Sequence, residues 1–82
     1  MPHLKTCQDI LRRLIAKGDT NNIPFAERAV DEYLAATPPQ ARKSGLRLLQ
    51  EDILIQRNAV LGSQRSFADT VYSYIESKLT AE

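Results

Sequence analysis

Residues 37–62 read TPPQARKSGLRLLQEDILIQRNAVLG. After the two prolines near its start, the stretch is rich in leucine, glutamine and arginine, which favour helices. We therefore predict one long helix that runs to Leu61, with Gly62 as its stop. Thr37 is the expected N-cap, and Gln40 is expected to complete a capping box with it. This helix is the longest that the sequence predicts.

Apolar residues of this segment lie on two sides of the expected helix. Counting 100° per residue from Leu46, one set falls within about 80° of that residue and forms an ordinary core face. A second set falls near the opposite side. The first set is Leu46, Leu49, Ile53, Leu54, Val60 and Leu61, and the second is Ala41, Leu48, Ile55 and Ala59. A helix that is apolar on two sides must either bury both or expose one.

Two interpretations of the second side remain open at this stage. In the first, the helix is central and its neighbours surround it. In the second, the side contacts another chain, because Leu48 and Ile55 are one heptad apart, which is the spacing of a helix-pairing seam. We therefore expect an interaction surface at Leu48, Ile55 and Ala59, flanked by Arg47 and Lys43.

Three further helices are predicted around the long one. The first covers His3–Lys17 and stops at Gly18, the second runs from Pro24 to about Thr37, and the third begins with Ser66 as its N-cap. Their expected core residues are Leu4, Cys7, Ile10, Leu11, Leu14 and Ile15, then Ala26, Ala29, Val30, Tyr33 and Leu34, then Phe67, Val71, Tyr74, Ile75 and Leu79.

The chain is therefore predicted to be all-α, as a small four-helix bundle with a long central third helix. Gly45 costs a helix about 1 kcal/mol relative to alanine, so a break there, giving five helices, stays open. With 82 residues, it is expected to form one domain over residues 1–82. Segment charges alternate in sign, as suits antiparallel helices beside oppositely charged neighbours.

The composition of the chain indicates the cellular compartment that we expect. We expect no secretory leader, because the first residues lack a long apolar run, and no apolar stretch is long enough to predict a membrane span. The single cysteine, Cys7, favours a reducing compartment, so a cytoplasmic location is expected. Small size and compactness suggest a bacterial or phage regulator.

No catalytic constellation is apparent in the sequence. His3 and Cys7 are four residues apart and could share a helix face, but a closed metal site needs four ligands. The isolated glycines form no phosphate loop. We expect no enzyme activity, no metal and no cofactor.

Two functions follow as hypotheses. The first is a protein–protein interaction or regulatory module that acts through helical surfaces as a homodimer, with a protein partner whose identity the sequence does not give. The alternative is a DNA-binding transcriptional regulator that uses the basic third helix, although the net charge of +1 argues against it. The residues that would contact nucleic acid are Arg42, Lys43, Arg47, Arg57 and Arg65.

Overall fold

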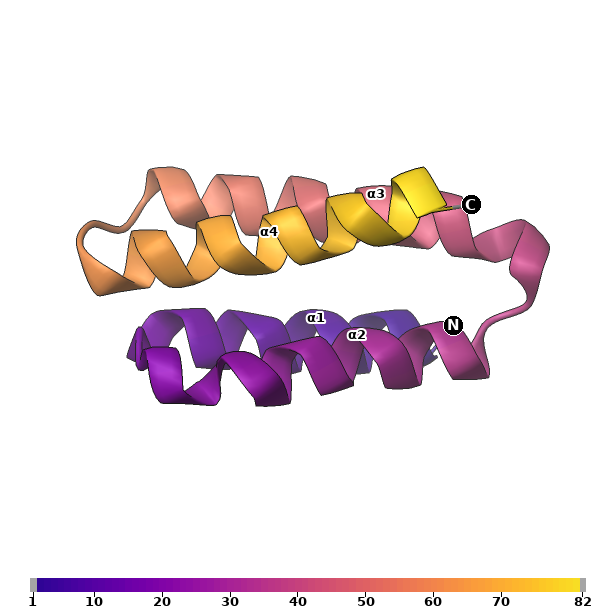
Figure 1. Ribbon diagram of the computed structural model, residues 1–82, viewed down its shortest axis with the longest axis horizontal. Coiled ribbons are helices and arrows are strands. Elements are labelled where there is room, and N and C mark those ends of the chain that lie inside the picture. Colours follow the sequence, from indigo (N-terminus) through magenta and orange to yellow (C-terminus); the bar gives the residue numbers. More distant parts are fainter. Residues whose placement is uncertain (1, 82) are drawn as a thin grey trace.

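The protein is a four-helix bundle. The computed structural model describes residues 2–81, and within them the chain forms α1 (Pro2–Lys17), a short 3-10 turn η1 (Thr20–Asn22), α2 (Ile23–Ala36), α3 (Pro39–Asn58) and α4 (Ser63–Ala81). Helices α1 and α2 form one layer and α3 and α4 the other, and successive helices run in opposite directions (Figure 1). The all-α, four-helix prediction is confirmed, and α3 is the longest helix.

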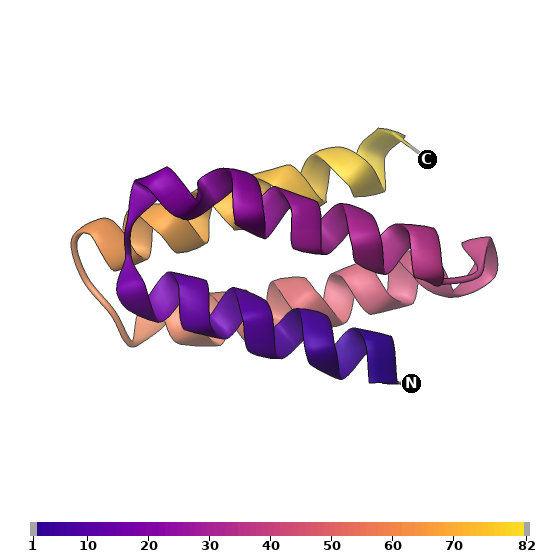
Figure 2. The same cartoon turned by 90° about the horizontal axis from the view of Figure 1, so that it is seen from below.

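The helices occupy the four corners of the bundle in the order α1, α2, α4, α3. Each helix of one layer therefore faces a parallel helix of the other, α1 facing α3 and α2 facing α4 (Figures 1 and 2). Consecutive helices α2 and α3 lie diagonally opposite each other, and only Thr37 and Pro38 connect them. As a result, α3 occupies a corner, with α1 on one side and α4 on the other.

One hydrophobic core fills the centre of the bundle. Most of the expected apolar stripes supply it, because each helix turns its apolar stripe toward the other three. Ile10 is an exception and remains partly exposed. The buried apolar residues are Cys7, Leu11, Ile15, Ala26, Ala29, Val30, Tyr33, Leu46, Leu49, Ile53, Phe67, Ala68, Val71 and Ile75.

Gly18 ends α1, as predicted. Its φ of 65° is left-handed, and its N–H donates to the Leu14 carbonyl at 3.1 Å. Gln64, in the first turn of α4, donates from its side-chain amide to the Ala16 carbonyl. The end of α1 is thus closed by its own glycine and by a side chain from α4.

The predicted N-cap of α3 is wrong. Pro38 is the residue that precedes the helix, and no side chain caps its first turn. Thr37 instead ends α2, where its buried hydroxyl donates to the Tyr33 carbonyl at 2.6 Å. Because Pro39 disfavours helical geometry in the residue before it, Pro38 is extended, and the two-residue connection leaves the Thr37 side chain beside the helix that it follows.

The end of α3 and the start of α4 also differ from the prediction. Helix α3 ends at Asn58, and Ala59, Val60, Leu61 and Gly62 form the connection to α4. Gly62, with φ 64°, turns the chain, and its carbonyl accepts from the Ser66 N–H at 3.1 Å. Ser66 therefore lies inside the first turns of α4. A helical hairpin needs a few non-helical residues to reverse direction, and residues 59–62 supply them.

Helix α3 passes through Gly45 without a break. A Cβ at this position would lie 1.7 Å from the Tyr33 hydroxyl oxygen and 2.8 Å from its Cζ, so the Tyr33 ring lies directly against the glycine backbone. The Tyr33 side chain of α2 can reach the α3 backbone across the diagonal because residue 45 has no side chain.

Polar contacts join neighbouring helices at the surface. Arg12 of α1 contacts both carboxylate oxygens of Asp52 in α3, at 3.1 and 3.2 Å. Arg57 of α3 pairs with Asp69 of α4. Between α2 and α4, the carboxylate of Asp31 accepts from the Tyr74 hydroxyl at 2.7 Å. Within residues 2–81, none of the helices has both the length and the apolar character needed to cross a bilayer.

Candidate interaction surface

The outward side of α3 carries large apolar side chains that the other helices cover only in part. Leu48, Leu54 and Ile55 are 47%, 43% and 71% exposed. Because α3 sits at a corner, α1 and α4 cover its inner side and its two flanks only. The interpretation in which neighbours surround α3 is therefore wrong for this side. We call the following residues the α3 face: Ala41, Lys43, Ser44, Arg47, Leu48, Glu51, Leu54 and Ile55.

Charge on the α3 face changes sign along the helix. Lys43 and Arg47 lie in its N-terminal half, and Glu51 lies one turn further on. All three side chains are exposed. Within the described residues, none of the three takes part in an ion pair, whereas Asp52 is held by Arg12 of α1. The face therefore presents opposite charges beside an apolar line.

Two shallow hollows border the α3 face. One, of about 160 Å³, lies toward α1 and is lined by Leu4, Tyr33, Thr37, Ala41, Ser44, Gly45 and Leu48. The other, of about 280 Å³, lies toward α4 and is lined by Arg47, Gln50, Glu51, Leu54 and Tyr72. Both are open depressions at the α3 flanks, which suits contact with protruding side chains better than enclosure of a small molecule.

Three small residues of α3 and Leu48 form the α3 wall of the first hollow. Its α3 members, Ala41, Ser44, Gly45 and Leu48, stand at positions i, i+3, i+4 and i+7. That spacing outlines the diamond-shaped hole that accepts one side chain of a facing helix in coiled-coil packing, and the Tyr33 ring covers its Gly45 corner from within the chain. The α3 face thus contains both protruding apolar side chains and a hole of the kind that such side chains fill.

Sequence reasoning placed Leu54 and Leu61 on the core side of the helix, and both are exposed, Leu61 at 76%. Leu54 lies about 80° from Leu46, where α4 no longer covers the helix. Leu61 lies beyond Asn58, the last residue of α3, so an angle counted along the helix does not predict which way its side chain points. The angle of Leu54 was the signal that could have placed it on the α3 face. Ala59, expected on the interaction side, is exposed just beyond the end of α3.

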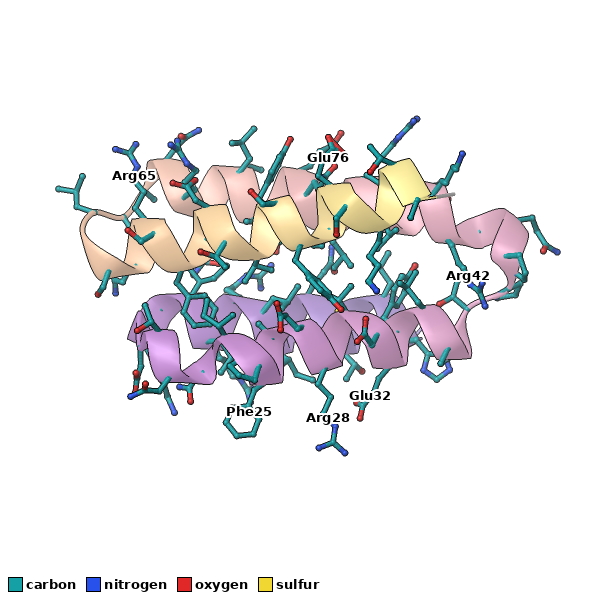
Figure 3. The ribbon with its side chains drawn as sticks, in the orientation of Figure 1. Phe25, Arg28, Glu32, Arg42, Arg65 and Glu76 are labelled. Carbon is teal, nitrogen blue, oxygen red and sulfur yellow. The ribbon has the colours of Figure 1, made fainter. Side chains whose placement is uncertain are left out.

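The five basic residues considered for nucleic-acid contact do not form one surface. Arg42 lies beside the α2–α3 connection and Arg65 near the opposite end of the bundle (Figure 3). The Arg42 Nε donates at 3.0 Å to the carbonyls of Leu34 and Thr37, at the end of α2. Arg57 is paired with Asp69. Lys43 and Arg47 belong to the α3 face.

Arg65 has the one buried side-chain nitrogen or oxygen, its Nε, for which the described residues supply no hydrogen-bond partner. The rest of the side chain is partly exposed. A guanidinium has further N–H groups, and those of Arg65 can reach solvent.

Cys7 and His3 border a third hollow, of about 120 Å³, between α1 and α2. The Cys7 side chain is only 3% exposed, and its thiol donates to the Ala29 carbonyl at 3.6 Å. Burial raises the pKa of the Cys7 thiol from 9.0 to about 12. The thiolate that nucleophilic attack or metal ligation requires is therefore scarce near neutral pH. Across residues 2–81, no group of three or more His, Cys, Asp or Glu side chains is arranged to hold a metal ion.

No protein-family model, no curated protein and no solved structure matches this chain. Functional inference therefore relies on the geometry of the α3 face.

Proposed function

We propose that the protein is a non-enzymatic protein–protein interaction module, of the regulatory kind, that acts through the α3 face and forms a homodimer. The observation that carries this proposal is the exposure of Leu48, Leu54 and Ile55 on the outward half of a single helix. Exposed apolar side chains that gather on one rigid element are typical of interaction sites. The hole next to Leu48 adds a matching recess.

The expected affinity of the dimer is modest. Removing the exposed parts of these three side chains from water would contribute about 3 kcal/mol per chain. The contribution from two chains is close to the lower end of the cost of association, which is about 4–15 kcal/mol. Hydrogen bonds and ion pairs at the rim add to it. The apolar surplus alone is therefore small, and we expect a weak, reversible dimer.

Sedimentation equilibrium tests the proposal over about 10 to about 500 µM protein, a range suited to a weak dimer. We expect reversible dimerisation that Ile55→Glu abolishes, because the substitution buries a carboxylate in the contact. Phe25→Glu is the matched control: Phe25 is 58% exposed on α2 and points away from the α3–α4 layer (Figure 3).

Two outcomes would overturn the proposal. One is a wild-type protein that stays monomeric over the whole range. The other is a dimer that Phe25→Glu dissociates and Ile55→Glu leaves intact, because the contact would then lie on the α1–α2 layer. Circular dichroism of each variant establishes that its helices are intact, which is expected because both side chains are largely exposed.

Nucleic-acid binding has weaker support. Two of the five basic side chains, Arg42 and Arg57, already serve contacts within the chain, and the net charge is +1. Within the α3 face, the basic residues are followed by Glu51, which would face a phosphate backbone unfavourably.

A further inference from the structure

The charges beside the apolar line of α3 distinguish between the possible arrangements of two copies. Arg47 and Glu51 are four residues apart, so they lie on the same strip of the helix, on the side nearer α4. In a parallel pair of α3 helices, the twofold axis runs along the helices, so the strip of one copy and the strip of the other lie on opposite sides of the contact. Arg47 and Glu51 would then have no partner of opposite charge on the other copy's strip.

In an antiparallel pair, the twofold axis crosses the two helices at right angles. A strip on one side of the contact then meets the same strip of the partner running in the opposite direction. If the axis passes at the level of Leu49, residue 47 of one copy lies opposite residue 51 of the other. Arg47 and Glu51 would then form two identical ion pairs across the contact.

The same register places an apolar side chain over the hole. Ile55 lies six residues beyond the axis, so it reaches the level of residue 43 in the partner. That level lies within the hole formed by Ala41, Ser44, Gly45 and Leu48, between its Ala41 and Ser44 members. Ile55 is the most exposed apolar side chain of α3. Leu48, one residue from the axis, lies about 3 Å along the axis from its own copy.

We propose that two copies of the chain pack their α3 helices antiparallel about a twofold axis at the level of Leu49, with Arg47 paired to the partner's Glu51 and Ile55 seated in the partner's hole. This inference rests on the proposed dimer and adds its orientation and register. Charge complementarity and the position of the hole support it independently, since the first involves the strip toward α4 and the second the hollow toward α1.

Charge reversal tests the register by sedimentation equilibrium. Arg47→Glu and Glu51→Arg each place like charges opposite one another, so each should weaken dimerisation at least about tenfold. The double variant exchanges the two charges and should return to within about threefold of the wild type. Arg28→Glu makes the same change in net charge as Arg47→Glu, at an exposed position on α2 away from the α3 face (Figure 3), and should have little effect.

A distance measurement gives the orientation directly. A nitroxide label on Gln40→Cys lies nine residues from the axis, so two labels would be separated by about 27 Å along the helices in the antiparallel pair. In a parallel pair they would lie side by side, within about 15 Å, because packed helix axes are 8–10 Å apart. Cys7 is buried and should not take up the label. Pulsed electron–electron double resonance between the two nitroxide labels distinguishes these distances.

The outcomes separate the two proposals. Single charge reversals that leave the dimer unchanged, or labels within about 15 Å, overturn the antiparallel register while the loss of dimer in Ile55→Glu still supports the interaction face. A wild-type protein that is monomeric throughout overturns both.

Discussion

Gly45→Ala is the substitution for which sequence and structure predict opposite results. From helix propensity alone, alanine inside α3 should stabilise the protein by about 1 kcal/mol. In the structure, the new Cβ would lie 1.7 Å from the Tyr33 hydroxyl oxygen, 2.8 Å from Cζ and 3.2 Å from Cε2. These three atoms belong to one rigid ring, so the ring must move as a unit.

Tyr33 has little room to move, because it is 7% exposed and lies within the core. Overfilling a packed site costs about 1–3 kcal/mol. Because this cost exceeds the gain in helix propensity, we expect Gly45→Ala to lower the free energy of unfolding by about 1 kcal/mol. For a chain of this size, that corresponds to a melting temperature lower by about 4–8 °C.

Thermal unfolding followed by circular dichroism measures this change. The control is the same substitution in a Tyr33→Leu background, where the ring is absent and alanine should become stabilising by about 1 kcal/mol. A melting temperature that rises in Gly45→Ala with Tyr33 present would refute this prediction. It would mean that the Tyr33 ring can pack in the core even when residue 45 carries a Cβ.

Three further predictions concern stability. Gly18→Ala should lower the free energy of unfolding in urea more than Gly62→Ala does. Both positions have positive φ, where a side chain costs about 1–2 kcal/mol, but only at Gly18 would the new Cβ also meet α4, 2.8 Å from Gln64 Cγ. Equal losses in the two variants would contradict this packing. Arg42→Lys should lower stability by about 1 kcal/mol in the same assay, because an ammonium does not reproduce the two bonds that the guanidinium Nε makes to the end of α2; an unchanged stability would mean that these bonds contribute nothing. The pKa of Cys7 is raised from 9.0 to about 12 by burial, so the folded chain keeps a proton that the unfolded chain loses; stability should fall as pH rises above 9, and a Cys7→Ala variant that falls equally steeply would exclude this contribution.

The candidate surface was only partly predictable from sequence. The heptad spacing of Leu48 and Ile55 indicated a second apolar side on α3, and both residues are exposed there. The hole beside Leu48 was not predictable, because Leu4 and Tyr33 from other helices also line it. The basic residues were grouped by proximity in sequence. Only the structure shows that Arg42 caps α2 and that Arg57 pairs with α4.

What the sequence determined by itself is local. Apolar residues at helical spacing, Gly18 at the end of α1 and Pro24 in the first turn of α2 settle that the chain is helical and where most helices lie. Each of these signals acts within a few residues along the chain, so it can be read without knowing the partner elements.

The tertiary structure decided which sides of the helices are covered. Helix α3 stands at a corner of the bundle, diagonally across from α2, so only α1 and α4 flank it and Leu48, Leu54 and Ile55 stay exposed. The tertiary structure also decided the role of Gly45, whose missing side chain admits the Tyr33 ring from a helix that is not adjacent. Contacts between residues far apart in sequence depend on how the helices are arranged, and a helical pattern within one segment does not contain that information.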